Sequence, residues 1–172
     1  DPILTYGTEE QKQKYLPDLA AGLKVGAFGL TEPGAGTDAA MQKTVAVDKG
    51  DHWELNGSKV FITNAQYADI FVVFDMVYRP DYKEVPYTNK DISAFIIERD
   101  FEGFSVQGHE LKMGIRGSST SELVFNDCIV PKENLLGELN KGFKVAMATL
   151  DGGRIGIGAQ ALGIAQAAID ET

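Results

Sequence analysis

The sequence predicts a mainly β fold, a barrel or sandwich, flanked by helices at both ends. Residues 25–130 contain many short apolar runs separated by Gly and Asn turn signals, which is typical of such a fold. Residues 8–22 begin with a helix start signal, and residues 142–169 carry apolar residues at three-to-four spacing. The predicted order is therefore helix, β-domain, helix.

Composition restricts the classes of function that need consideration. The chain has 172 residues, 44% of them hydrophobic, which excludes disorder and fits one ordinary domain. A formal net charge of −9 argues against nucleic-acid binding, which needs a basic face. The single cysteine, Cys128, excludes an internal disulfide and indicates a reducing compartment. No apolar run is long enough for a membrane span, so none is expected.

The two ends of the sequence suggest a segment of a longer protein. The first residue is Asp1 rather than methionine, and the helical pattern at 160–172 has no Gly, Asn or Pro stop signal. We therefore interpret the chain as part of a larger one.

The first predicted element is a helix that starts after Thr8. Thr8 and Gln11 fit a capping box, in which each side chain bonds the other residue's backbone N–H. Pro17 is expected to end or kink this helix, and Gly22 to close the segment that follows.

The central region is predicted to consist of short strands. Apolar or alternating runs occur at 25–30, 43–48, 53–55, 59–63, 70–76, 93–98, 104–106 and 122–125. Asn56-Gly57 predicts a hairpin between two of these strands. Residues 77–91, with two prolines and three tyrosines, are predicted to form an exposed loop.

After Pro131 the pattern becomes helical again. Residues 142–150 and 154–169 have helical spacing of Ala, Leu, Ile and Met, with Asp151, Gly152 and Gly153 between them. Arg154 is therefore expected near the start of a helix.

Residues 28–38, reading FGLTEPGAGTD, have the pattern of a strand that runs into a ligand-binding loop. Pro33 cannot continue a strand ladder, and Gly34 and Gly36 allow a sharp turn and a close approach of backbone to ligand. Gly34, Gly36 and Ala39 also fit G-x-G-x-x-A, but a strand pattern follows instead of the helix that a dinucleotide site requires.

Two threonines stand at strand ends. Thr31 and Thr63 each follow an apolar run and precede a turn-forming residue, so we expect them side by side on a cofactor-binding face. The alternative is that both are β-branched filler. His52 and His109 are isolated, Cys128 has no activating neighbour, and no obvious catalytic nucleophile or base is present.

FGLTEPGAGTD resembles the first signature of the acyl-CoA dehydrogenase family. The similarity continues through FITN at 61–64, LKMGIRGSSTSELVF at 111–125 and VPKENLLG at 130–137. Residues 142–166 are similar to the short-chain, butyryl-CoA branch. Met41 departs from the family signature, which ends on a small residue, and the family often has Trp where Phe61 stands.

The resemblance implies a middle β-domain of the acyl-CoA dehydrogenase fold with the ends of two helical domains. Residues 1–24 would end the N-terminal helical domain, 25–137 would form the middle domain, and 138–172 would begin the C-terminal helical domain. The full-length protein would assemble as a tetramer.

The resemblance also implies site residues. The FAD site would contain Phe28, Gly29, Leu30, Thr31, Glu32, Pro33, Gly34, Ala35, Gly36, Thr37, Phe61, Ile62 and Thr63. Thr31 would bond the pyrimidine edge of the flavin and Thr63 would reach N5. The acyl-CoA substrate would be contacted by Thr37, Asp151, Gly152, Gly153 and Arg154.

The implied activity is the FAD-dependent α,β-dehydrogenation of a short-chain acyl-CoA thioester to the trans-2-enoyl-CoA. Electron-transfer flavoprotein would accept the electrons, in the bacterial cytoplasm or the mitochondrial matrix. The family's catalytic Glu lies beyond Thr172, so the segment alone is predicted to be inactive. The alternatives are a glutaryl- or branched-chain acyl-CoA dehydrogenase, and a non-catalytic β-domain that binds an acyl carrier or a protein partner.

Overall fold

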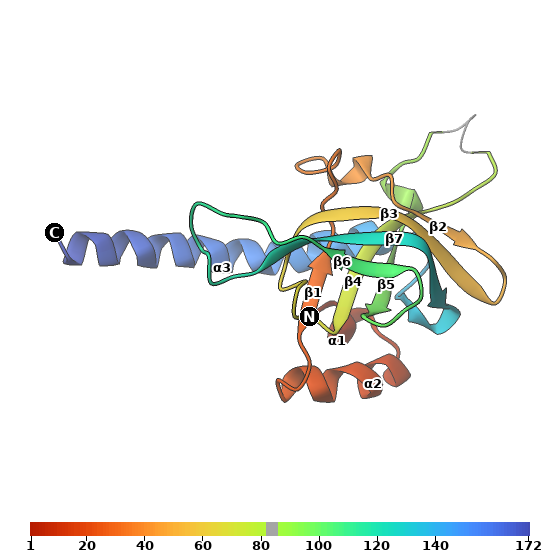
Figure 1. The fold of residues 1–172 in the computed structure, drawn as a ribbon, viewed down its shortest axis with the longest axis horizontal. Helices are drawn as coiled ribbons and strands as arrows, with labels where there is room; N and C mark the ends of the chain where they lie inside the picture. The colour runs from red at the N-terminus through yellow and green to blue at the C-terminus, as the bar shows by residue number, and fades with distance from the viewer. Residues whose placement is uncertain (82–85) are drawn as a thin grey trace.

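The computed structural model describes residues 1–81 and 86–172 and confirms the predicted order of helix, β-domain and helix (Figure 1). The helices are α1 (Pro2–Tyr6), α2 (Glu9–Ala20) and α3 (Gly142–Asp170). The strands are β1 (Gly26–Gly29), β2 (Val45–Asp48), β3 (His52–Thr63), β4 (Ile70–Val77), β5 (Ile92–Glu98), β6 (Phe104–Gln107), β7 (Thr120–Pro131) and β8 (Leu135–Leu136). Three short 3-10 helices cover Ala39–Met41, Asn89–Asp91 and Lys132–Asn134.

Helix α2 begins where the sequence predicts. The Thr8 hydroxyl accepts from the Gln11 N–H at 3.2 Å, and the Gln11 side-chain oxygen accepts from the Thr8 N–H at 3.1 Å. Pro17 does not end the helix, which continues to Ala20. The Pro17 carbonyl still accepts from the Ala21 N–H. Gly22 follows with φ +71°, a conformation that suits glycine at the end of a helix.

One mixed sheet holds all eight strands, in the order β6-β7-β3-β2-β4-β5-β8 with β1 paired to β4. Alternate residues of β4 face two different cores, as the period of two of a strand requires. One core lies against α1, α2 and α3. In the other, β4 and β5 pack over β3, β6 and β7, with Phe71 and Phe104 rings 4.8 Å apart and Trp53 and Phe95 rings 5.4 Å apart. The sheet is thus folded over its own core, as in a sandwich.

The edge of β4 that faces β1 and β2 is interrupted. β1 pairs in parallel with residues 70–73, and β2 pairs in parallel with residues 76–77. Because β5 occupies the opposite edge and pairs with Phe74 and Asp75 there, β1 and β2 share this one, and these two residues have no partner strand on it. The chain leaves the sheet after β1 and returns at β2, and we call the intervening residues 30–44 the glycine-rich loop.

The predicted hairpin at Asn56-Gly57 is wrong. Strand β3 continues through both residues and shifts its register against β7 between Leu55 and Gly57. A two-residue hairpin of the expected type needs positive φ at both central residues, and Asn56 does not have it, whereas Gly57 has φ +142°. The Asn56 side chain instead bonds Asp127 of β7, accepting from its N–H at 2.9 Å and donating to its carboxylate at 3.0 Å. The pairing of β3 with β7 therefore contains a bulge at Asn56 and Asp127.

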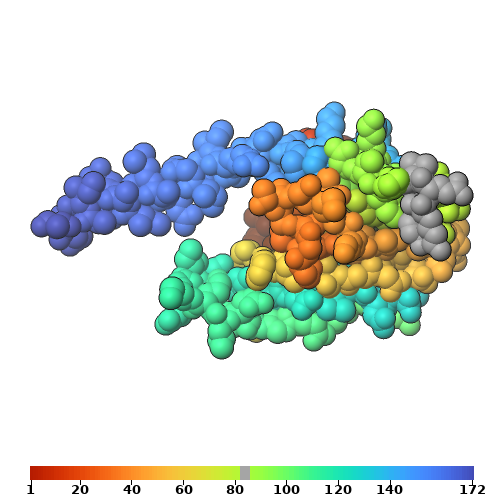
Figure 2. Space-filling view, turned by 90° about the horizontal axis from the view of Figure 1, so that it is seen from above, coloured from red at the N-terminus to blue at the C-terminus, as the bar shows by residue number. Residues whose placement is uncertain are grey.

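The C-terminal region is one helix of 29 residues where the sequence pattern predicts two. Gly152 and Gly153 continue it, since a glycine within a helix costs only about 1 kcal/mol. Arg154 therefore lies in the middle of α3, and the expectation that it stands near a helix start is wrong. From Asp151 onward every residue is exposed, and this part of α3 projects beyond the β-domain (Figure 2).

The predicted loop at 77–91 is described only in part, because residues 82–85 lie outside the described residues. In its described part, the Arg79 side chain pairs with Asp81 and with Asp91, each at 3.0 Å. Within residues 1–81 and 86–172, no helix has both the length and the apolarity needed to cross a bilayer.

A first prediction compares two glycines of α3. A Cβ on Gly142 would stand 2.3 Å from the Ser93 carbonyl carbon, whereas one on Gly163 would meet nothing within 4 Å. In the 172-residue chain, Gly142→Ala should lower the free energy of unfolding by about 1–3 kcal/mol through overpacking. Gly163→Ala should raise it by about 0.5–1 kcal/mol, because alanine favours the helix. Urea unfolding measures both, and similar effects of the two changes would contradict this docking of α3.

A second prediction concerns Cys128, which is fully buried. Burial raises the pKa of its thiol to about 12. At about pH 8 only roughly one thiol in ten thousand would be ionised, and the thiolate is the reactive form. Iodoacetamide should therefore label the native chain far more slowly than the chain in concentrated urea, as followed by mass spectrometry. Equal labelling rates would show that Cys128 is accessible.

Candidate cofactor-binding site

A pocket of about 630 Å³ lies where the glycine-rich loop, the end of β3 and helix α3 meet. Apolar side chains form much of its lining, and three threonines and one arginine add polar groups. The lining residues are Phe28, Leu30, Thr31, Gly36, Thr37, Asp38, Ala39, Phe61, Ile62, Thr63, Phe143, Met147, Leu150 and Arg154.

The pocket brings together residues that the sequence analysis singled out from distant parts of the chain. Thr31 and Thr63 both line it, which agrees with the expectation that they share one face. Arg154 joins them from α3. The other sequence-predicted residues in its lining are Phe28, Leu30, Gly36, Thr37, Phe61 and Ile62.

The remaining sequence-predicted residues do not line this pocket. Gly29 is packed so closely that a Cβ would come 3.1 Å from both Leu123 and Val73. Pro33 and Gly34 line a separate, smaller pocket of about 310 Å³, together with Glu32. The others outside the lining are Ala35, Asp151, Gly152 and Gly153.

Phe61 presents its ring to the pocket because β3 is irregular near its end. The register against β7 shifts between Lys59 and Ile62, and Phe61 has φ +60°, which is uncommon for a large residue. Phe61 is left 64% exposed. The preceding N–H, of Val60, donates to the Thr31 carbonyl at 2.9 Å and fastens the loop to β3. Sparsely populated backbone conformations of this kind cluster at ligand sites.

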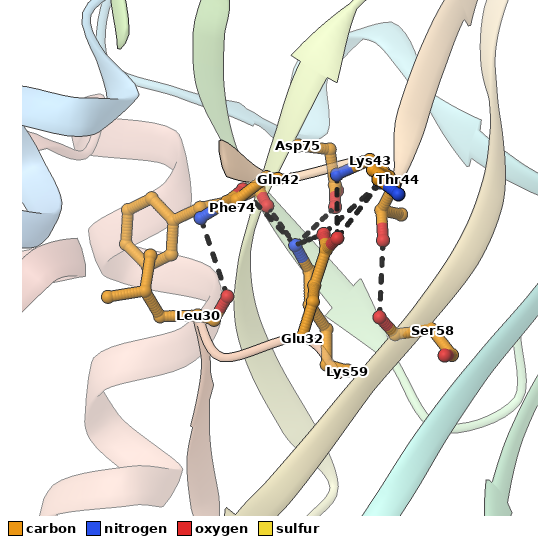
Figure 3. Close-up of polar contacts among 9 residues, drawn as sticks. All are labelled: Leu30, Glu32, Gln42, Lys43, Thr44, Ser58, Lys59, Phe74 and Asp75. Carbon is orange, nitrogen blue, oxygen red and sulfur yellow. Dashed lines mark hydrogen bonds and ion pairs between the residues drawn. The ribbon is translucent and has the colours of Figure 1, made fainter. Parts of the chain in front are cut away.

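Beneath the loop lies a buried ion cluster, shown in Figure 3. The Lys59 ammonium has no exposed side-chain surface and lies 2.7 Å from a Glu32 carboxylate oxygen and 3.1 Å from an Asp75 oxygen. It also donates to the Gln42 side-chain oxygen at 3.3 Å and to the Phe74 carbonyl. Burial raises the pKa of the Asp75 carboxyl, and the attraction of Lys59 opposes this only in part.

Glu32 belongs to this cluster and does not face the pocket. Its carboxylate accepts from the backbone N–H of Lys43 at 2.6 Å and of Thr44 at 3.1 Å, besides binding Lys59. Burial alone would raise the pKa of Glu32, but the charge and hydrogen bonds of Lys59, Thr44 and Lys43 lower it overall. The Glu32 side chain thus holds the loop together, whereas the resemblance had implied a cofactor contact.

Lys59 and Asp75 were not among the site residues predicted from the sequence. The available signal was Asp75, one carboxylate inside the apolar strand IFVVFDMV, because a lone charge in a buried strand requires a partner. Lys59 gave no such signal, since lysine at a strand end is ordinarily exposed.

Among the described residues that line the pocket, no catalytic base is evident. Asp38 contributes the only carboxylate to the described lining, and it is exposed and accepts from the Ala40 N–H at 3.1 Å. His52 lies elsewhere, paired with Asp51 at 2.6 Å. Among residues 1–81 and 86–172, no group of His, Cys, Asp and Glu could hold a metal ion.

The lining fits a flat heteroaromatic group such as a flavin. Phe61, Ile62 and Leu30 provide apolar walls, and the hydroxyls of Thr31 and Thr63 provide hydrogen bonds of the kind that orient such a ligand. A second, mostly apolar pocket of about 560 Å³ adjoins the first and shares Phe28, Thr63 and Leu150 with it. The two pockets together could hold an aromatic cofactor next to an apolar substrate chain.

Known proteins of one family resemble this chain along nearly its whole length. Residues 27–128 match the acyl-CoA dehydrogenase middle domain, 140–172 the C-terminal domain and 1–23 the N-terminal domain of that family. The short-chain specific acyl-CoA dehydrogenase of Clostridium acetobutylicum is 61% identical over 98% of this chain and 43% of its own length. The mitochondrial short-chain specific enzyme of Homo sapiens is 50% identical over 98% of this chain and 40% of its own length.

Solved structures also superpose on this chain. The butyryl-CoA dehydrogenase of Megasphaera elsdenii superposes with a TM-score of 0.88 at 55% identity, over 96% of this chain and 42% of that one. A chain from a study of the electron transferring flavoprotein of Acidaminococcus fermentans gives 0.88 at 59% identity, with the same coverage. An acyl-CoA dehydrogenase complexed with FAD from Bacillus anthracis gives 0.76 at 47% identity, over 85% of this chain and 24% of that one.

The sequence spans less than half the length of these relatives, and its β-domain has the fold of their middle domain. The chain therefore belongs to the acyl-CoA dehydrogenase family.

Proposed function

We propose that the full-length protein containing this chain catalyses the FAD-dependent α,β-dehydrogenation of short-chain acyl-CoA thioesters. The observation that carries the proposal is a pair of adjoining pockets, with Thr63 lining both. One lies at the glycine-rich loop, the end of β3 and α3, and the other lies against α1, α2 and β1. This arrangement would place an apolar acyl chain beside an aromatic cofactor. The identity to short-chain enzymes supports the choice of substrate.

In this proposal the chain binds and orients the cofactor. Thr31 and Thr63 supply hydroxyls and the loop supplies backbone N–H groups, which stabilise negative charge as it develops on a bound acceptor. When bound, FAD supplies the redox chemistry by accepting hydride from the thioester. Phe61 and Ile62 exclude water from one wall of the pocket.

On the substrate side, we place the CoA contacts on α3 and the loop. Arg154 lines the pocket and carries a positive charge suited to the phosphates of CoA. Gly152 and Gly153, which precede it on the same exposed helix, leave room for a bulky ligand. Asp151 and Thr37 complete the proposed set.

The catalytic base is proposed to be a glutamate outside these 172 residues. Asp38, the one carboxylate in the described lining of the cofactor pocket, is engaged at the start of a 3-10 helix, and Asp1, which lines the adjoining pocket, accepts from the Thr5 hydroxyl at 3.5 Å. The remaining expectations are assembly as a tetramer, electron transfer to an electron-transfer flavoprotein, and location in the bacterial cytoplasm or the mitochondrial matrix. The first two depend on surfaces that a full-length protein provides.

The experiment that tests the function uses the purified full-length protein. We expect a yellow, FAD-containing protein that bleaches an electron-acceptor dye with butyryl-CoA, and does so faster than with glutaryl-CoA or isobutyryl-CoA. Faster turnover of one of those two would move the assignment to the glutaryl- or branched-chain enzymes. A colourless protein that binds no FAD would support a non-catalytic β-domain.

A third prediction tests Arg154 in the full-length protein. Arg154→Ala should raise KM for butyryl-CoA about tenfold, because a charge-assisted hydrogen bond contributes about 1.5–3 kcal/mol. Lys144→Ala is the matched control, since Lys144 is exposed on the same helix and does not line the pocket. Steady-state kinetics of both variants measure the effect. An unchanged KM for Arg154→Ala would remove Arg154 from the CoA site.

A fourth prediction concerns the 172-residue chain by itself. Compared with the full-length protein, the chain lacks about four hydrogen bonds to FAD, at about 1 kcal/mol each. It should therefore bind FAD about a thousandfold more weakly. Without the glutamate, no dehydrogenation is expected. The purified chain is mixed with FAD, butyryl-CoA and the dye. Sustained bleaching that depends on butyryl-CoA would show that a base lies within these residues.

A further inference from the structure

Lys59 fills an opening in the sheet that the glycine-rich loop creates. The opening lies on one edge of β4 between its pairing with β1 and its pairing with β2, and Phe74, whose carbonyl accepts from Lys59, has no partner strand on that edge. A buried carbonyl without a hydrogen bond is unfavourable, and the Lys59 ammonium donates to this one. The lysine thus supplies β4 with a hydrogen bond that a continuous neighbouring strand would otherwise supply.

The same ammonium holds both ends of the loop. Glu32, near its start, binds Lys59 at 2.7 Å, and Gln42, near its end, accepts from Lys59 at 3.3 Å. The Gln42 amide also donates to the Leu30 carbonyl at 3.4 Å. In Figure 3 the side chains from the loop, from β3 and from β4 converge on this one nitrogen.

These contacts determine where Thr31 lies. Thr31 stands between Leu30, whose carbonyl binds Gln42, and Glu32, whose carboxylate binds Lys59. Its own carbonyl accepts from the Val60 N–H at 2.9 Å, next to Lys59 on β3. Four residues beyond Lys59 on the same strand is Thr63, which lines the pocket with Thr31.

Stability alone does not explain a charged group at this position. Replacing a buried ion pair by apolar residues of similar volume is often neutral or stabilising. Methionine at position 59 would fill a similar volume but could not bind a carboxylate, an amide oxygen and a carbonyl together. What the lysine adds is a fixed geometry of three segments.

We propose that Lys59 is a positioning residue for the cofactor pocket, whose ammonium closes the base of the glycine-rich loop and sets Thr31 in place relative to Phe61 and Thr63. The inference rests on the proposed function, in that FAD is taken to be the occupant of the pocket. Lys59 itself does not line the pocket and acts through the loop.

The test compares two lysine-to-methionine changes in the full-length protein. Lys59→Met removes the buried cation, and Lys14→Met removes an exposed one that pairs with Glu98 at 2.7 Å. The readouts are the FAD dissociation constant, the visible absorption bands of bound flavin and its reduction potential, beside the thermal unfolding temperature. Lys59→Met should raise the dissociation constant about tenfold or more and shift the bands, because small displacements of positioning groups have large effects. Lys14→Met should change neither.

If Lys59→Met does not fold, Glu32→Gln provides the test of the inference. It keeps the side-chain volume and one oxygen for Lys59, so a smaller rise in the FAD dissociation constant, about threefold, is expected with the same direction of band shift. A folded Lys59→Met protein with a lower unfolding temperature but unchanged FAD affinity, bands and potential would overturn the inference, and so would an unchanged Glu32→Gln protein. A wild-type protein that binds no FAD would refute the proposed function and the inference with it, whereas an unchanged variant of an FAD-binding wild type refutes the inference alone.

Discussion

The structure depends on one interruption of backbone pairing. Strand β4 is buried along nearly its whole length, and one of its edges is shared by β1 and β2 with a gap between them. A buried strand tolerates such a gap only if other donors satisfy its polar groups. Lys59 supplies the donor, and its charge in turn requires Glu32 and Asp75. The glycine-rich loop can leave the sheet at this point because those groups compensate for the missing strand.

Local signals in the sequence predicted much of this fold. The Thr8 capping box, the strands that form β4 and β5, and the loop with Gly34 and Gly36 after β1 were all evident, because each depends on residues close together in the chain. The presence of Thr31 and Thr63 in one pocket was also predictable from their places at strand ends. The roles of the individual site residues came from family resemblance rather than from pattern.

Long-range contacts explain what the sequence did not predict. Asn56-Gly57 has the composition of a hairpin, but Asn56 bonds Asp127 of β7, and strand β3 continues through both residues with a shift in register. Helix α3 runs through Gly152 and Gly153 although they have the composition of a break. Lys59 and Asp75 are adjacent only because β3 and β4 are brought together by the fold. A side chain's partner across the sheet cannot be inferred from its neighbours in the chain.

The anchoring of the glycine-rich loop has an entropic consequence. Ordering one residue of a flexible chain costs about 1–2 kcal/mol, and a loop that is ordered only on ligand binding carries that cost at each encounter. Here Glu32, Gln42 and the Thr31 carbonyl are already bound by β3. The loop is therefore ordered when the sheet folds, and a ligand of the adjacent pocket would not carry the cost of ordering it.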